Sequence, residues 1–577
     1  MPAPTAPGPQ KRSRRRKPDG ERRDPLQNPL LSLPAVAFVV VAFFVPVAVL
    51  VTYSLWPTEA GQIVHDWTLE NYTRFFREGT YSRTLVDTFW FVGLSSLVTV
   101  VLTFPFAYFV AQKVKPSRRI YWIMVAILPF WTSYLIRVFA WRNMFGDTGI
   151  LNDTLNRIGV ISEPLAFLGF SRPAILITFV YLLFPLAFLT SYITLERMDP
   201  MLLEAGNDLG ASRRQRMTRI VLPIARTGLV AGFLLSFITM IGDYVTPSMI
   251  GGTSGTFFSN LVVNQFGNSL QWGFGASLSL ILLASVLLML FILRRATGAV
   301  DSAGEYTRRY VPSKARGLRA YSILFVGFLY LPIVLLFLFS FNDAEYVGFP
   351  YEGFTTRWFS AVFDDPSLRD AFWTSIRVAA SSVALSVLLG TAAAVQFART
   401  TGRTRNLSLA TVTMPLLLPP VVLGIAIIIG LNALGVQRGL WTIVLGHTIL
   451  TLPVVTLLVL SRLEGLDRNQ ELAAMDLGAT PLKTFLRVSL PQAMPGIVAA
   501  AMIALAMSMD EFILTFLVTG ADTTLPLYIF GSIRFQVTPI LTALSSLMMA
   551  ASFLLVILGA LIAFGRGRAN RTPGAMQ

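Results

Sequence analysis

The chain has 577 residues, of which 54% are hydrophobic and 14% charged, and its mean hydropathy is +0.62. These values exclude an ordinary soluble enzyme and a disordered chain, and they indicate a membrane protein. The formal net charge of +16 is also typical of nucleic-acid-binding proteins, so the positions of the charges must distinguish the two classes. The chain has no cysteine and two histidines, His65 and His447, which excludes disulfides, cysteine nucleophiles and metal sites built from thiolates or several histidines.

Twelve apolar stretches follow one another along the chain. A bilayer core of roughly 30 Å requires about 20 apolar residues per helix. The first six stretches are residues 31–56, 86–112, 119–143, 172–194, 225–250 and 274–295. The second six are residues 320–341, 371–396, 408–434, 440–461, 492–518 and 538–564. No stretch alternates as a barrel strand does, so we predict an all-α, polytopic membrane protein with twelve transmembrane helices.

The basic residues gather in alternate loops. With the N-terminus placed in the cytoplasm, 35 of the 47 Lys and Arg residues lie in cytoplasmic segments, as the positive-inside rule requires. This asymmetry accounts for the net charge without nucleic acid. The basic run at 11–24 is interpreted as a topology anchor that also touches anionic membrane lipid, and the long apolar stretch after it argues against a signal peptide. We expect a multi-pass protein of the cytoplasmic membrane with both termini inside.

The two sets of six stretches are diverged copies of one sequence. Pro46 aligns with Pro332 at an offset of 286 residues, and Pro185 aligns with Pro453 at an offset of 268. Because six is even, both copies enter the membrane in the same direction, as parallel repeats with a translocation path between them. The predicted domains are a basic cytoplasmic arm (1–30), a first half (31–295), a cytoplasmic linker (296–319), a second half (320–564) and a cytoplasmic tail (565–577).

The loop between the fourth and fifth stretches carries the best-defined repeated motif. In each copy a short predicted helix ends at a glycine, and a second short helix leads to an aliphatic residue and then Leu-Pro. The motif residues are Glu204, Ala205, Gly210, Ile220, Leu222 and Pro223 in the first copy, and Glu471, Ala473, Ala474, Gly478, Val488, Leu490 and Pro491 in the second. Such a helix suits docking into a groove of a cytoplasmic partner; the alternative is a surface helix that only closes the loop.

The first motif, EAGNDLGASRRQRMTRIVLP, resembles the coupling-loop signature of ABC importer permeases and departs from it only at Gly206. In the second copy Leu472 takes the glutamate position, with Glu471 one place earlier, which leaves the salt bridge of that glutamate open. The resemblance implies the type I ABC importer permease fold. It implies as partners two copies of a cytoplasmic ABC ATPase subunit, which use ATP and Mg, and an extracytoplasmic solute-binding protein. The chain has no G-x-x-x-x-G-K-[ST] loop, so we expect it to bind no cofactor and not to be an enzyme itself.

Two pairs of segments indicate which group of ABC importer permeases the chain resembles. Residues 128–152 and 242–252 resemble one subunit of spermidine/putrescine-type permeases, and residues 509–520 and 524–550 resemble its partner subunit. The chain thus resembles the two subunits fused, which implies polyamine import. Fused permeases for ferric iron, thiamine or another small solute are alternatives. A secondary transporter is a further alternative, but it would leave the paired coupling loops without a purpose.

Charged residues inside membrane stretches are costly, so they are candidates for the substrate pathway. The candidates, with nearby aromatic residues, are Asp243, Tyr244, Asp510, Glu511, Phe512 and Trp131. Carboxylates and aromatic rings together provide the counter-charge and cation–π surfaces that an ammonium chain requires. Alternatively, Asp243 and Glu511 pair with Arg137 or Arg377, or cap the ends of the fifth helices. His447 is interpreted as an interhelical hydrogen bonder rather than a proton relay.

Overall fold

The computed structural model describes residues 28–146, 149–199, 201–297, 315–535, 538–551 and 553–554. These residues are predominantly helical, and their only strands form one antiparallel hairpin of β1 (Thr58–Glu59) and β2 (Gln62–Ile63). The predicted arm, linker and tail lie wholly or mostly outside the described residues.

The elements of the two halves follow in chain order. The first half contains η2 (Pro29–Leu31), α1 (Leu33–Val39), η3 (Val40–Phe44), α2 (Val45–Ser54), α3 (Glu70–Arg77), α4 (Gly79–Tyr108), η4 (Phe109–Lys113), α5 (Pro116–Ile127), η5 (Leu128–Trp131), α6 (Tyr134–Met144), α7 (Ile150–Arg157), η6 (Ala166–Leu168), α8 (Arg172–Glu196), α9 (Met201–Asp208), α10 (Arg213–Arg216), η7 (Met217–Val221), α11 (Leu222–Ile241), α12 (Val245–Ile250), η8 (Gly252–Gly255), α13 (Phe258–Gly267) and α14 (Trp272–Thr297). The second half contains α15 (Arg316–Phe339), α16 (Arg357–Asp364), α17 (Pro366–Arg399), α18 (Arg403–Thr413), η9 (Met414–Leu417), α19 (Pro420–Ala433), α20 (Leu440–Glu464), α21 (Arg468–Asp476), α22 (Pro481–Thr484), η10 (Phe485–Ser489), α23 (Leu490–Asp510), α24 (Ile513–Val518) and α25 (Leu525–Phe535).

Within these ranges, nine helices are long and apolar enough to cross a membrane, and two bent helix pairs raise the number to eleven. A shorter apolar helix, Pro539–Ala551, covers the start of the predicted twelfth stretch, and the rest of that stretch lies outside the described residues. Some spans consist of several consecutive helical elements. For example, α1, the π-helical turn η3 and α2 follow one another without a break and form the single span Leu33–Ser54. The all-α polytopic fold is confirmed.

The third stretch of each half is broken, which corrects the prediction of one helix over 119–143 and one over 408–434. The two pieces of the span meet at 80° between η5 and α6 in the first half, and at 104° between η9 and α19 in the second. Prolines lie close to both breaks: Pro129 is in η5, Pro419 is the N-cap residue of α19, and Pro420 is its first residue. Proline lacks the N–H that continues a helix, and in the second half the residues before the two prolines, Leu418 and Pro419, have ψ of 136° and 137°. In the first half the chain is extended at Thr132 and Ser133, three and four residues after Pro129.

The fifth stretches begin and end earlier than the predicted 225–250 and 492–518. Residues Arg213–Ile241 form one helix and residues Pro481–Asp510 another, each continuing through a π turn, η7 or η10. The prediction of a separate second loop helix is therefore wrong, because the π turn accommodates the proline that follows it without ending the helix. After the span ends, a break leads to the short helices α12 and α24.

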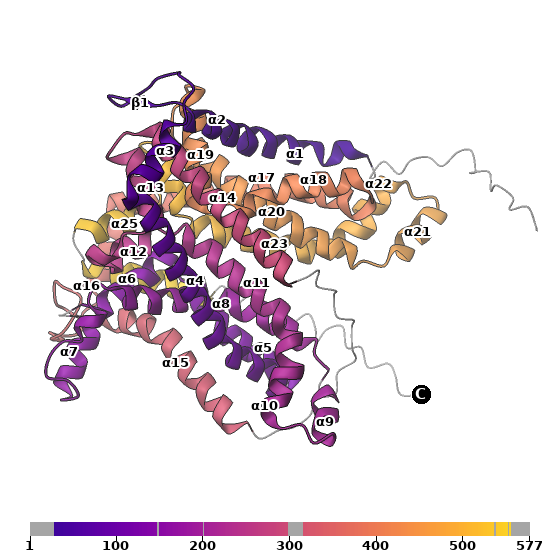
Figure 1. Cartoon of the computed structure of the whole chain (residues 1–577). Coiled ribbons are helices and arrows are strands. Elements are labelled where there is room, and N and C mark those ends of the chain that lie inside the picture. The colour runs from indigo at the N-terminus through magenta and orange to yellow at the C-terminus, as the bar shows by residue number, and fades with distance from the viewer. Residues whose placement is uncertain are drawn as a thin grey trace, which may run out of the picture.

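Each half extends its first span across the other half. The span that contains α2 packs along α19, where a Cβ on Gly430 would lie 3.0 Å from Pro46 Cβ. Reciprocally, α15 packs against α4 and α6 of the first half. Figure 1 shows this exchange: α1 and α2 run along the α17–α19 lobe, and α15 runs along the lobe of α4 and α5. The halves are thus interlocked as well as repeated.

Equivalent ion pairs occur in the two halves. Arg119 lies 3.4 Å from Glu196, and Arg405 lies 2.7 Å from Glu464. The two arginines differ by 286 in residue number and the two glutamates by 268, which are the offsets of the sequence repeat. Each pair links the start of the third span to the end of the fourth, so the repeat extends to side-chain contacts.

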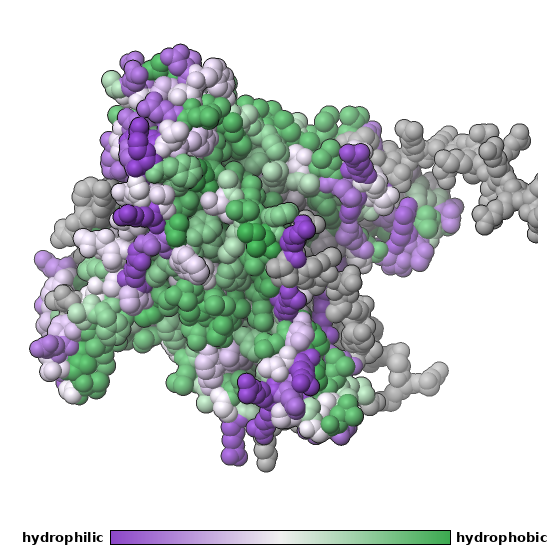
Figure 2. Space-filling model, in the orientation of Figure 1, coloured by the Kyte–Doolittle hydropathy of each residue, from purple (hydrophilic) through white to green (hydrophobic). Residues whose placement is uncertain are grey.

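The surface of the molecule has an apolar middle and polar ends. Figure 2 shows hydrophobic residues over the central part of the visible face and hydrophilic residues toward its two ends. Large apolar side chains such as Trp90, Leu324 and Leu388 point outward and are 77%, 74% and 69% exposed. Water would disfavour this much exposed apolar surface, whereas the hydrocarbon core of a bilayer accommodates it.

The repeat provides a matched test of packing between the fourth and fifth spans. A Cβ on Gly228 would clash with the Thr190 carbonyl oxygen, and a Cβ on its counterpart Gly496 would lie 2.7 Å from Cγ and 2.9 Å from Cβ of Arg462. We expect Gly228→Ala and Gly496→Ala each to cost about 1–3 kcal/mol of stability by overpacking. The control is Gly93→Ala in α4, where a Cβ would meet no atom within 4 Å. Thermal unfolding of the purified protein measures all three, and equal shifts for Gly228→Ala and Gly93→Ala would contradict this packing.

Candidate functional site

The two predicted coupling loops, residues 201–223 and 468–491, have the same backbone geometry. Gly210 and Gly478 have φ of +76° and +86°, a left-handed conformation that glycine adopts without strain. In the first loop the Ala211 N–H donates to the Gly206 carbonyl at 2.9 Å, and in the second the Ala479 N–H donates to the Ala474 carbonyl at 3.1 Å. Figure 1 shows α9 and α10 at the tip of one lobe and α21 and α22 at the tip of the other, at the same end of the molecule.

Each loop presents a leucine outward just before its glycine. Leu209 and Leu477 are 86% and 90% exposed and occupy equivalent positions in the repeat. Sequence reasoning missed them, although the alignment of the two copies contains them as a matched pair. An apolar side chain this exposed at the polar end of the molecule is suited to burial in a groove of another protein.

The glutamate of the second loop makes the salt bridge that the sequence left open. Arg399, in the last turn of α17, donates to Glu471 at 2.7 Å, and the Ser489 hydroxyl also donates to this carboxylate. In the first loop, Glu204 is exposed and has no side-chain partner among the described residues. Gly206, the departure from the signature, lets α9 pack closely, since a Cβ there would lie 2.9 Å from Ile220 Cδ1.

The break after the fifth span of the first half is organised by Asp243. This buried carboxylate accepts the backbone N–H groups of Val245 and Thr246 at 2.8 and 3.0 Å, which caps α12. It also accepts the hydroxyl groups of Thr246 at 2.6 Å and of Tyr134 at 2.7 Å. These four donors satisfy the carboxylate, so the geometry favours the capping interpretation of Asp243 over an arginine pair.

The break in the second half leaves its two carboxylates partly exposed. Glu511 accepts the Leu514 N–H at 2.8 Å and caps α24. Asp510 instead crosses to the first half, where it accepts the Tyr134 N–H at 2.6 Å and lies 3.6 Å from the guanidinium of Arg137. The Asp510 side chain is 31% exposed. Tyr134 therefore contacts a carboxylate of each half, through its hydroxyl to Asp243 and its N–H to Asp510.

The chain matches the family described as the binding-protein-dependent transport system inner membrane component over residues 26–303 and 386–566. The chain belongs to this family. It is the permease of an ABC importer, and the resemblance to ABC importer permeases is confirmed.

Two relatives of this permease are separate proteins of Escherichia coli. The spermidine/putrescine transport system permease protein PotB is 33% identical over 274 residues, which are 47% of this chain and 98% of PotB. The putrescine transport system permease protein PotI is 37% identical over 240 residues, which are 40% of this chain and 85% of PotI. Each separate protein matches about half of this chain, so the permease is a fusion of two permease units.

A solved bacterial ABC transporter, involved in the import of the acidic polysaccharide alginate, is also similar to the permease. Its sequence is 15% identical, its TM-score is 0.33, and the match covers 45% of this chain and 100% of that one. This likeness is too low to support a conclusion.

Aromatic rings from both halves of the permease gather beside the carboxylates. Tyr244 lies 6.3 Å from Phe512 and 5.9 Å from Phe516 between ring centroids, and Phe530 lies 4.7 Å from Phe512. The predicted residues Tyr244 and Phe512 thus meet at the boundary between the halves. Trp131 lies in η5, next to the first break; its side chain is outside the described residues.

The two remaining polar candidates lie elsewhere. Arg377 donates to the Trp373 carbonyl and the Thr374 hydroxyl within its own helix and contacts no carboxylate among the described residues. Both ring nitrogens of His447 are 2.7 Å from hydroxyl groups, Nδ1 from Ser508 and Nε2 from Thr515. The Thr515 hydroxyl gives its one hydrogen to the Glu511 carbonyl, so Nε2 is the donor in its bond. This geometry agrees with the interhelical interpretation of His447.

Tyr134 was missed by sequence reasoning, and its two roles can be separated experimentally. Tyr134→Phe keeps the N–H bond to Asp510 but removes the hydroxyl from the buried Asp243 carboxylate, which we expect to cost about 1–3 kcal/mol. The control is Tyr181→Phe, since the buried Tyr181 hydroxyl has no hydrogen-bond partner in the described part of the chain. Thermal unfolding of both variants is the measurement, and an equal effect of the two would contradict the role of the Tyr134 hydroxyl.

Proposed function

We propose that this permease forms the path by which an ATP-driven importer moves a polyamine such as spermidine or putrescine across the cytoplasmic membrane. The names of the two relatives support this substrate class. The observation that carries the proposal is the pair of partly exposed carboxylates, Asp510 and Glu511, beside aromatic rings at the boundary between the halves. Carboxylates attract ammonium groups, and aromatic faces stabilise them further. The same machinery serving ferric iron, thiamine or another small solute is the alternative.

The proposed assembly contains two copies of a cytoplasmic ATPase subunit, one on each coupling loop, and a solute-binding protein on the opposite face. The arm, the linker, the tail and both termini then lie in the cytoplasm, where the basic residues of the loops also lie. ATP and Mg are used by the ATPase subunits, and this chain holds no cofactor. The arm remains proposed as a lipid-contacting anchor.

The continuous helices Arg213–Ile241 and Pro481–Asp510 supply the mechanical link. Each begins within a coupling loop and ends at the break that holds a candidate carboxylate. A movement imposed on the loop by an ATPase subunit is therefore transmitted along one helix to the boundary between the halves. In the second half the Arg399–Glu471 ion pair, both of whose side chains are 15% exposed, also ties the loop to the second span.

The two exposed leucines provide a test of docking. We expect Leu209→Asp and Leu477→Asp each to reduce the amount of ATPase subunit that copurifies with the permease by tenfold or more, because each places a charge where an apolar contact is buried. The control is Leu434→Asp, which alters a leucine that is 69% exposed at the end of α19 away from the loops. Normal copurification of both loop variants would remove these leucines from the interface.

The substrate is tested by reconstituting the permease with its ATPase and solute-binding protein in liposomes. We expect spermidine or putrescine to stimulate ATP hydrolysis and to accumulate inside, and ATP depletion to stop uptake while a proton gradient is held. Stimulation by ferric iron or thiamine, with no response to either polyamine, would transfer the proposal to that solute. Uptake that persists without ATP would indicate a secondary transporter.

A further inference from the structure

Arg137 is a buried cation with weak compensation. Its residue is 4% exposed in α6, and its Nη2 lies 3.6 Å from the Asp510 carboxylate, beyond hydrogen-bond length. Its guanidinium lies 4.9 Å from the centroid of the Phe130 ring, and its Nε has no hydrogen-bond partner within the described ranges. A charge removed from water normally needs close pairing and full hydrogen bonding. This arginine has neither.

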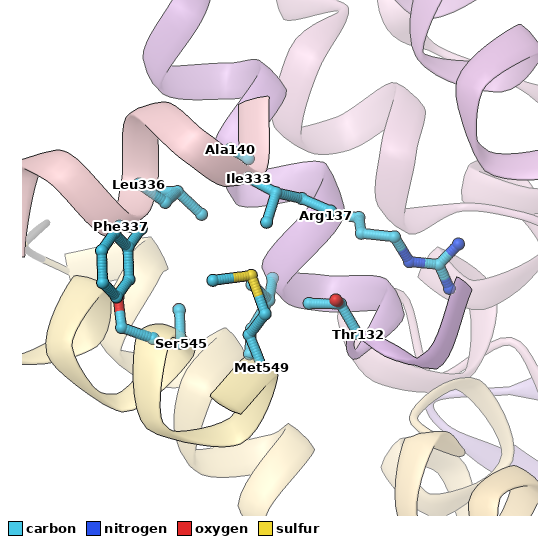
Figure 3. A pocket seen from close by; sticks show the side chains of 10 residues that line it. Thr132, Arg137, Ala140, Ile333, Leu336, Phe337, Ser545 and Met549 are labelled. Atoms are coloured by element: carbon cyan, nitrogen blue, oxygen red, sulfur yellow. The ribbon is translucent and has the colours of Figure 1, made fainter. Parts of the chain in front are cut away.

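The guanidinium of Arg137 lies at the boundary between the two halves, near Asp510. The stem of Arg137 lines a small, mainly apolar pocket with residues of α15 and the last described helix, among them Ile333 and Met549. Figure 3 shows the guanidinium extending away from this pocket. The side chain of its partner Asp510 is 31% exposed, against 5% for that of Arg137. The carboxylate is therefore the more accessible member of the pair, and the arginine is the enclosed one.

The Arg137–Asp510 pair differs from the other ion pairs. It is the longest of those between described residues and the one that joins the two halves, whereas Arg399–Glu471 is 2.7 Å long and lies within one half. A long, incompletely bonded pair is poor at holding helices together.

The repeat shows that packing does not require these charges. Leu423 stands at the position equivalent to Arg137, and Gly242 at the position equivalent to Asp510. At this equivalent contact between the halves, a Cβ on Gly242 would lie 2.8 Å from Pro419 Cβ, and Leu423 is fully buried. The equivalent contact thus closes with apolar residues, so packing between the halves does not by itself require the charges.

We propose that Arg137 is a resident counter-cation that weakens the hold of Asp510 on a substrate ammonium group. This inference rests on the proposed cationic substrate. A transport path must bind its solute strongly enough to admit it and weakly enough to release it. A free carboxylate in a membrane interior would retain an ammonium group, whereas a carboxylate already facing a guanidinium attracts it less. Arg137 therefore sets the affinity of the path and promotes release of the substrate.

The test compares Arg137→Gln and Arg137→Leu, the second of which copies the equivalent residue Leu423. The full permease with its ATPase and binding protein is reconstituted for uptake, and the permease alone is used for equilibrium binding of radiolabelled spermidine. We expect both variants to bind spermidine at least tenfold more tightly and to show a lower maximal rate of uptake. The additional change Asp510→Asn should abolish the gain in affinity.

The control is Arg142→Gln. Arg142 lies in the same helix and also contacts the second half, but it donates to a backbone carbonyl, that of Ile533 at 3.1 Å, rather than to a carboxylate. Its affinity should stay unchanged. Folded Arg137 variants with unchanged or weaker spermidine binding would overturn the inference while leaving the proposed function intact. Failure of the unaltered permease to import spermidine is a failure of the proposed function. If its substrate is then another cation, the same comparison is made with that cation, and a neutral or anionic substrate overturns both.

Discussion

A helix that breaks inside a membrane leaves backbone groups that water cannot reach, and these groups must find partners within the protein. The rest of the central architecture of this permease depends on this constraint. At each break after a fifth span, a carboxylate caps the next short helix: Asp243 caps α12, and Glu511 caps α24. The backbone carbonyl groups left without a helical partner at the breaks also find donors. The Ser259 hydroxyl donates to the Asp243 carbonyl, and the Thr515 hydroxyl donates to the Glu511 carbonyl.

The same constraint joins the two halves. The break in the third span of the first half exposes the N–H of Tyr134, and the partner that satisfies it is Asp510 of the second half. Acidic residues in the membrane are thus not all alike. The Asp243 carboxylate is buried and accepts four hydrogen bonds, whereas Asp510 and Glu511 stay partly exposed at the boundary between the halves. A charge that looks functional in sequence can be structural when backbone donors surround it.

The helices that end at these breaks begin in the predicted coupling loops, so the loops proposed to bind the ATPase subunits and the candidate carboxylates lie on the same elements. The two loops share a backbone turn and an outward leucine but differ in their support. Glu471 is held by Arg399 and Ser489, whereas Glu204 faces outward. The substitution at Leu472 therefore does not remove the salt bridge from the second half, because the neighbouring glutamate makes it from one position earlier in the helix.

The sequence by itself determined the class of the protein, most of its spans, the repeat and the coupling loops, because hydropathy, proline position and glycine turns are properties of short segments. It also selected Asp243, Tyr244, Asp510, Glu511 and Phe512 as candidates for the substrate pathway, because charged residues inside membrane stretches are costly. Only the tertiary structure decided where spans break and which carboxylate is satisfied. Tyr134 and Asp510 are 376 residues apart, and no local pattern encodes that contact. It exists because two interrupted helices from different halves meet where neither can complete its own hydrogen bonds.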